Sequence, residues 1–64
     1  MTHEHLKQLR KGAGLSQSKA ADLVHVSQRS WARYESGDRH VPRGVLELFC
    51  MKIGKDVQRE FPSP

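Results

Sequence analysis

Three polar side chains at the start of one predicted helix have the chemistry to recognise the edges of nucleobases. Gln28 and Arg29 come directly after Ser27, a residue type that begins helices, and Arg33 lies one turn further along. The planar guanidinium of arginine matches O6 and N7 of guanine, and the amide of glutamine matches N6 and N7 of adenine. This chemistry makes Gln28, Arg29 and Arg33 candidates for reading base edges. The alternative is a solvated basic face, and Arg33 has the further alternative of a phosphate contact.

The helix that carries these side chains, predicted over residues 27–36 and ended by Gly37, has two distinct faces. At 100° per residue, one face holds Ser30, Trp31 and Tyr34, and the other holds Gln28, Arg29, Ala32 and Arg33. An apolar back and a polar, cationic front are what a helix needs if it is held by a core and presented to a ligand.

A second short helix precedes it and begins in the same way. Ser16 is the predicted N-cap, and Gln17 is the first helical residue. The apolar face holds Ala20, Ala21, Leu23 and Val24, and the polar face holds Ser18, Lys19 and Asp22. The connection to the next helix, residues 24–26, is tight. Two helices joined by so short a turn form a helix-turn-helix, whose second helix enters the DNA major groove.

Three further helices are predicted around this pair. The first has Thr2 as N-cap, ends at Gly14 and carries Leu6, Leu9 and Ala13 on one face. After an exposed turn at residues 38–41, the fourth starts with Pro42, ends at Gly54 and carries Val45, Leu46, Phe49, Cys50 and Ile53 on one stripe. A short fifth helix covers residues 56–61, before Pro62. With no strand signal, we expect a single all-α domain of five helices over residues 1–64.

Composition narrows the function classes. The chain has 64 residues, with 11 Lys and Arg against 7 Asp and Glu, and such a basic balance suits a polyanionic partner. One cysteine, expected to be buried, and scattered histidines (His3, His5, His25 and His40) predict no metal site. With no membrane-spanning run, signal peptide or pocket-forming architecture, we expect a cytoplasmic protein of the bacterial nucleoid that is not an enzyme and binds no cofactor or small-molecule ligand.

The motifs then identify a resemblance that covers roughly residues 5–61. Leu9-Arg10, Gly14-Leu15-Ser16-Gln17, Ala21, Val26-Ser27-Gln28, Trp31 and Glu35-x-Gly37 resemble the Cro/CI-type (XRE) helix-turn-helix proteins, five-helix DNA-binding domains with a lambda-repressor-like fold. The run RSWARYESGDRHVP followed by LELFCMKIG is similar to very short regulators of phages and mobile elements, including the anti-CRISPR-associated autorepressors.

The resemblance implies roles for further residues. It implies phosphate contacts at the start of the second helix and after the third, from Ser16, Gln17, Arg39, His40 and Arg43. Gln17 would also pack beside Gln28. Arg10 and Glu35 match a pair that ties the first helix to the end of the third. The sequence departs from the family at His25, where the turn normally has Gly, and at Ala20, where Leu is usual and where Trp31 is expected to fill the space.

A two-fold interface is the functional interpretation of a surplus of apolar residues on the fourth and fifth helices. Leu48 and Met51 fall off the apolar stripe, and the predicted dimer seam consists of Leu48, Met51, Val57 and Phe61. The alternative is that the C-terminal segment folds back over Leu48 and Met51. A dimer places two recognition helices one DNA turn apart on an inverted repeat.

These observations predict a homodimeric, sequence-specific repressor that binds a palindromic operator in double-stranded DNA through the major groove. Without a sensor domain, control by its own concentration favours repression of its own operon. Two alternatives stay open: an antitoxin-type regulator of a toxin–antitoxin pair, and a protein-interaction adaptor that keeps the fold without binding DNA.

Overall fold

Two serine caps begin the central helices of the protein. In the computed structural model, which describes residues 2–63, the Ser16 hydroxyl accepts the backbone N–H of Lys19 (3.1 Å) and begins α2, Gln17–Leu23. The Ser27 hydroxyl accepts the N–H of Ser30 (3.0 Å) and begins α3, Gln28–Ser36. A side-chain oxygen that accepts an otherwise unpaired N–H of the first turn is the ordinary N-cap. Both predicted caps are confirmed.

The turn between α2 and α3 includes one strained residue. His25 has φ +59°, in the left-handed region that favours glycine, the residue expected at this place in the turn. The N–H of Val26 still reaches the carbonyl of Ala21 (3.0 Å) across the turn. At the other end of α3, Gly37 has φ +84° and ends the helix as predicted.

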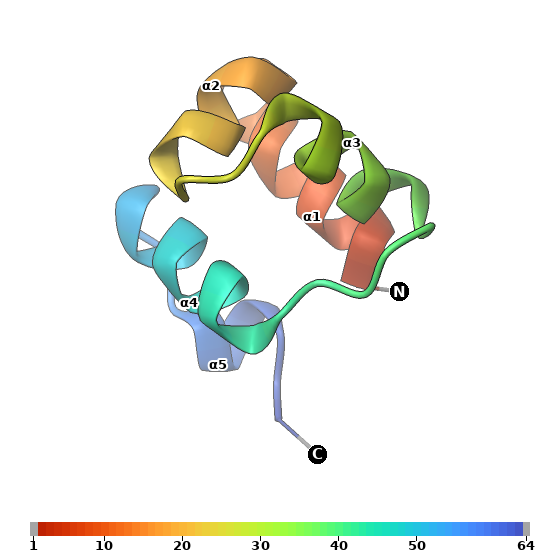
Figure 1. Ribbon diagram of the computed structural model, residues 1–64. Helices are drawn as coiled ribbons and strands as arrows, with labels where there is room; N and C mark the ends of the chain where they lie inside the picture. Colours follow the sequence, from red (N-terminus) through yellow and green to blue (C-terminus); the bar gives the residue numbers. More distant parts are fainter. Residues whose placement is uncertain (1, 64) are drawn as a thin grey trace.

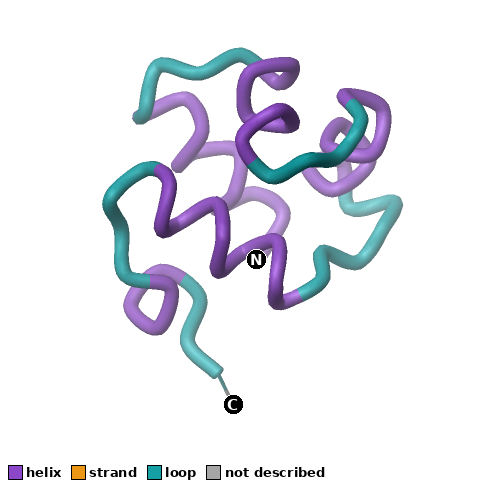
Figure 2. The backbone as a smooth tube through the Cα atoms, turned by 60° about the vertical axis from the view of Figure 1, so that its left-hand side comes forward, coloured by secondary structure: helices purple, strands orange, loops and turns teal. Residues whose placement is uncertain are grey.

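Three more helices complete the described part of the chain: α1 (Thr2–Gly12), α4 (Arg43–Lys52) and α5 (Val57–Glu60). In Figure 1, α1 lies behind α2 and α3, and α4 and α5 lie together on the other side of the molecule. Residues 2–63 contain no strand, and the longest connection is the loop of residues 37–42 before α4 (Figure 2). The predicted all-α, five-helix architecture is confirmed.

The core lies where α1, α3 and α4 meet. Leu6, Trp31, Phe49 and Cys50 are its largest fully buried side chains, and the rings of Trp31 and Phe49 lie 4.9 Å apart between centroids. Ala20 is also fully buried. A small residue at that position accords with the expectation that the bulky Trp31 occupies the space of the family's usual Leu.

Several helix ends differ from the prediction by one residue. α1 includes Thr2 rather than starting after it, and Ala13 lies beyond its end and is exposed. Pro42 is the N-cap of α4 and not its first residue, because its carbonyl accepts the N–H groups of Val45 and Leu46 (3.0 and 3.3 Å).

Two predictions near the C-terminal half also need correction. Val41, expected in an exposed turn, is buried, because the loop before α4 turns this apolar side chain into the core. The fifth helix is shorter than residues 56–61: Asp56 is its N-cap, accepting the N–H of Gln58 (3.0 Å), and Phe61 follows its last residue. None of the helices in residues 2–63 has the length and apolar character needed to cross a membrane.

Candidate nucleic-acid interface

Helix α3 divides into a buried face and an exposed face as its sequence predicts. Trp31, Tyr34 and Glu35 are 0, 6 and 7% exposed. Gln28, Arg29 and Arg33 are all exposed, and Ala32, which lies among them, is half-buried. The cationic front of α3 is therefore open to a ligand while its back is fixed. Contact of these three side chains with bases stays a prediction.

A buried carboxylate fixes that back face. Glu35 accepts hydrogen bonds from Nε and Nη2 of Arg10 (2.5 and 3.1 Å), from Nε2 of Gln17 (3.1 Å) and from Nε1 of Trp31 (2.5 Å). Arg10 also donates through Nη1 to the carbonyl of Leu15 (2.9 Å). The network thus joins α1, the start of α2 and α3. The Arg10–Glu35 pair implied by the resemblance is confirmed, whereas the bonds from Gln17 and Trp31 were not predicted.

The same contacts set the acidity of Glu35. Burial on its own raises the pKa of this carboxyl, but the hydrogen bonds from Arg10, Gln17 and Trp31 and the charge of Arg10 outweigh burial, so the pKa lies below its ordinary value. Glu35 is therefore held ionised, as an acceptor for all its donors.

The predicted phosphate-binding residues at the start of α2 have structural partners of their own. Gln17 is half-buried and gives one amide hydrogen to Glu35. Its packing beside Gln28 stays a prediction. The hydroxyl of Ser16 is exposed and already accepts the N–H of Lys19. Both residues still lie at the N-terminal end of α2, where backbone N–H groups favour an anion.

The structure separates the three predicted phosphate contacts after α3, of which two lie in the loop of residues 37–42 and one at the start of α4. Arg39 reaches back along α3 and donates to the Ser30 hydroxyl (3.3 Å), so its cation lies beside the first turn of that helix. His40 is exposed. Arg43 instead points toward the C-terminal segment and donates through Nη1 to the carbonyl of Phe61. Only Arg39 is thus placed directly against the helix that carries the base-reading candidates.

The four residues of the predicted dimer seam differ in exposure. Met51 is 67% exposed, and Leu48 and Val57 are half-buried and packed against the core. Phe61 is buried at 6% exposure, with its ring centroid 5.1 Å from that of His5 in α1. The C-terminal segment thus folds back within one chain, but it does not cover Met51 as the alternative expected. Of the four residues, only Met51 is largely exposed, and the seam stays a prediction.

Cys50, His5 and Glu60 are titratable residues that lie outside the exposed face of α3. The Cys50 thiol is buried as predicted, and burial, with the charges of Glu60 and Asp56, raises its pKa despite Arg43. His5 Nε2 lies 2.9 Å from Oε1 of Glu60 and joins α1 to α5. Within residues 2–63, no group of three His, Cys, Asp or Glu side chains is arranged to hold a metal ion.

The structure thus has two capped helices joined by a tight turn, and the second helix, α3, buries one face and exposes a polar one. This arrangement defines a DNA-binding helix-turn-helix regulator. The chain belongs to the helix-turn-helix domain family, which it matches over residues 4–59. It is also similar to the antitoxin PezA of Streptococcus pneumoniae serotype 4 (strain ATCC BAA-334 / TIGR4), with 34% identity over 53 residues. That alignment covers 83% of this chain and 34% of PezA, so the chain spans about a third of the relative's length. No solved structure matches the chain.

Proposed function

We propose that this protein is a sequence-specific transcriptional repressor of the Cro/CI (XRE) type. In this proposal it binds an inverted-repeat operator as a homodimer and represses its own operon, in a phage or mobile element such as those with anti-CRISPR-associated regulators. Gln28, Arg29 and Arg33 read base edges in the major groove. Ser16, Gln17, Arg39 and His40 position the domain on the phosphates.

One observation carries the proposal: the exposed front of α3 is cationic while its back is fixed by a buried hydrogen-bond network. Arg29 and Arg33 are exposed, and Glu35 on the opposite side is 7% exposed with donors from three segments of the chain. Base readout needs donors held in a fixed orientation, because a bidentate contact gives about 1–3 kcal/mol only when both hydrogen bonds form. An adaptor would not need this cationic front.

Two arguments support a dimer in this proposal: the small number of DNA contacts that one copy can make, and the exposed side chain of Met51. A single small module has too few contacts for tight operator binding, and two copies on an inverted repeat combine their contacts. Met51, at 67% exposure the large apolar side chain most open to solvent in residues 2–63, is the centre of the proposed seam.

The test is binding to the DNA upstream of the protein's own gene and to a scrambled duplex, across a salt series. The native site should bind more tightly up to physiological salt, and Arg29→Ala should remove that preference. Lys7→Ala, an exposed cation of α1, is the matched control for lost charge. Equal, steeply salt-dependent binding to both duplexes would show that the target is wrong, and no binding to either would favour the adaptor.

The similarity to PezA supports a second candidate, an antitoxin-type regulator. This candidate predicts that the gene next to this one encodes a protein that stops growth when expressed alone. Co-expression of this chain should then restore growth, and the two proteins should copurify. If the neighbouring product is harmless and does not copurify, the repressor proposal stands without a toxin partner.

A further inference from the structure

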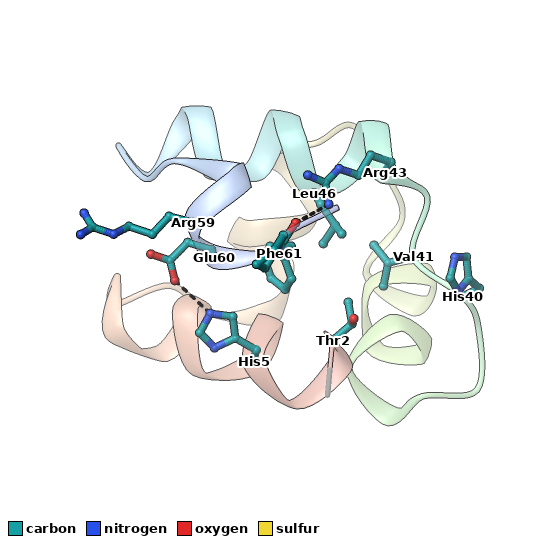
Figure 3. Close-up of a pocket in the computed structure, with 10 residues that line it drawn as sticks. Thr2, His5, His40, Val41, Arg43, Leu46, Arg59, Glu60 and Phe61 are labelled. Atoms are coloured by element: carbon teal, nitrogen blue, oxygen red, sulfur yellow. Dashed lines mark hydrogen bonds and ion pairs between the residues drawn. The ribbon is translucent and has the colours of Figure 1, made fainter. Parts of the chain in front are cut away.

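A groove lies between the first turns of α1, the loop before α4 and the end of α5. Its volume is about 970 Å³, and its lining includes His40, Arg43, Leu46, Arg59, Glu60 and Phe61 (Figure 3). No lining residue belongs to α2 or α3. The groove is thus separate from the α2–α3 pair, and of its lining residues the proposed function uses only His40, at the edge nearest the loop before α4 (Figure 3).

The groove is electropositive. Arg43 and Arg59 contribute two guanidinium groups, and Glu60 is the one carboxylate among the lining residues. That carboxylate is already engaged, because Oε1 of Glu60 lies 2.9 Å from Nε2 of His5. Unpaired positive charge in a concave surface attracts anions, since the low-dielectric walls focus the field.

Arg43 has hydrogen-bonding capacity left over. Nη1 donates to the carbonyl of Phe61, and within residues 2–63 its one ion-pair partner is the exposed Glu47, whose Oε2 is 3.9 Å from Nε. Nη2 has no acceptor among these residues and is buried, whereas the Arg43 side chain as a whole is 35% exposed and lines the groove. A buried donor without a partner is unfavourable, and a carboxylate supplies the best-matched acceptor for a guanidinium.

The groove also has an apolar floor and separated cations. Val41, Leu46 and Phe61 are each buried at its base. Figure 3 shows Arg59 toward one end and His40 toward the other, with Phe61 between them. Groups placed along a groove in this way suit an extended peptide, which presents acidic and apolar side chains alternately along its length.

We propose that this groove binds an acidic peptide segment of a partner protein, with carboxylates at Arg43 and Arg59 and an apolar side chain over Leu46 and Phe61. A second copy of this chain is a poor occupant. Its 7 Asp and Glu are scattered with no two adjacent, and its net charge is +4. Because α2 and α3 contribute nothing to the groove, the partner can bind without contacting the base-reading side chains.

The probe is a short fluorescein-labelled peptide in which glutamate alternates with leucine and serine. Its counterpart has every glutamate replaced by glutamine. Fluorescence anisotropy and ¹H–¹⁵N NMR on the full chain then report affinity and location. The acidic peptide should bind, its counterpart should not, and backbone signals at 40–46 and 59–62 should shift while those of α3 stay fixed.

The decisive variant is Arg59→Gln, because Arg59 is exposed and its only hydrogen bond among the described residues, to the carbonyl of Asp56, comes from its backbone N–H. Its affinity for the acidic peptide should fall at least about tenfold, the loss expected for one charge-assisted hydrogen bond. Lys7→Gln, an exposed cation outside the groove, should bind as the parent does. Arg43→Gln tests the second guanidinium in the same binding assay. Its circular dichroism spectrum is recorded as well, to show that the variant is folded.

Four outcomes would overturn the proposal. Equal losses in Arg59→Gln and Lys7→Gln would mean that only net charge matters. Peptide-induced shifts confined to α3 would mean that the acidic peptide mimics DNA there. Shifts at 59–62 produced by a DNA duplex would assign the groove to the DNA backbone. Shifts at 40–46 and 59–62 produced by raising the protein concentration alone would assign it to a second copy. If the protein binds the peptide but not the operator DNA, the repressor proposal fails and the groove proposal stands.

Discussion

The indole N–H of Trp31 donates to the carboxylate of Glu35 one helical turn away, with Nε1 and Oε2 2.5 Å apart. Both side chains are buried on the back of α3, and the same carboxylate accepts from Arg10. Glu35 therefore joins Trp31, the largest aromatic residue of the core, to Arg10, its partner in the one buried ion pair among residues 2–63. This group of three side chains sets how α3 rotates about its axis, and hence which side chains it exposes.

Glu35→Gln should strongly destabilise the protein. The substitution leaves the Arg10 guanidinium, 8% exposed, without its anionic partner, and breaking a buried pair in this way costs about 3–5 kcal/mol. Urea unfolding followed by Trp31 fluorescence measures the change. Glu47→Gln is the control, because this carboxylate is 57% exposed in an i, i+4 pair with Arg43 and such pairs contribute less than about 1 kcal/mol. Similar losses in both variants would refute the claim that the Glu35 network holds the fold.

The ionisation of Glu35 should also make stability fall in acid. Its pKa is lower in the folded protein than in the unfolded chain, so its contribution is fully present above the unfolded value, about 4.3, and is lost as pH falls through the folded value. Carboxyl ¹³C NMR should place the Glu35 midpoint below about 4.3, and the urea midpoint should fall over the same range. A Glu35 midpoint above that value would contradict the assigned hydrogen bonds.

The sequence was sufficient for the fold because local signals agree with one another. Ser16, Ser27 and Gly37 mark helix ends through interactions within a few residues, and the spacing of Trp31 and Tyr34 defines the buried face of α3. Signals of this kind need no knowledge of distant parts of the chain. The resemblance added Arg10 with Glu35, a contact between residues far apart in sequence.

Periodicity did not reveal which way long polar side chains turn. Arg39 and Arg43 lie in the same basic stretch, yet one reaches α3 and the other the carbonyl of Phe61. Val41 between them has no helical pattern to mark it as buried. The bond from Gln17 to Glu35 likewise depends on how α2 and α3 cross. Such choices are settled by packing between elements, which a single sequence does not display.

Arg39→Ala and Arg43→Ala should separate these two roles. Each phosphate contact contributes about 0.9 to the slope of log affinity against log salt, so Arg39→Ala should reduce the slope by about that amount. Arg43→Ala should leave the slope unchanged and instead lower the free energy of unfolding, because it removes the bond to Phe61. Operator titrations at several salt concentrations and urea melts of both variants test this assignment. A reduced slope for Arg43→Ala would restore its predicted phosphate contact.

Met51→Asp should weaken self-association and operator binding together without unfolding the domain. The side chain is 67% exposed, so a charge there is tolerated in one copy but is unfavourable in an apolar seam. Sedimentation velocity measures the oligomeric state, and operator affinity is measured on the same samples. Lys52→Asp, the exposed neighbour, controls for added negative charge. A Met51→Asp protein that remains dimeric would place the seam elsewhere.

His25→Gly should stabilise the protein, unlike most substitutions to glycine. His25 has φ +59°, a conformation that costs a residue with a side chain about 1–2 kcal/mol, and glycine removes this cost. Glycine also loses more conformational entropy on folding, which lowers stability by about 0.5–1 kcal/mol. The net gain of up to about 1.5 kcal/mol should raise Tm by several degrees in a domain of this size. Ser18→Gly, an exposed residue in α2 with no positive φ, should lower Tm instead. His25→Val should lower it further, since a β-branched side chain is poorly tolerated at this φ. If His25→Gly also lowers Tm, then the turn between α2 and α3 is not strained, and the departure from the family's glycine carries no cost.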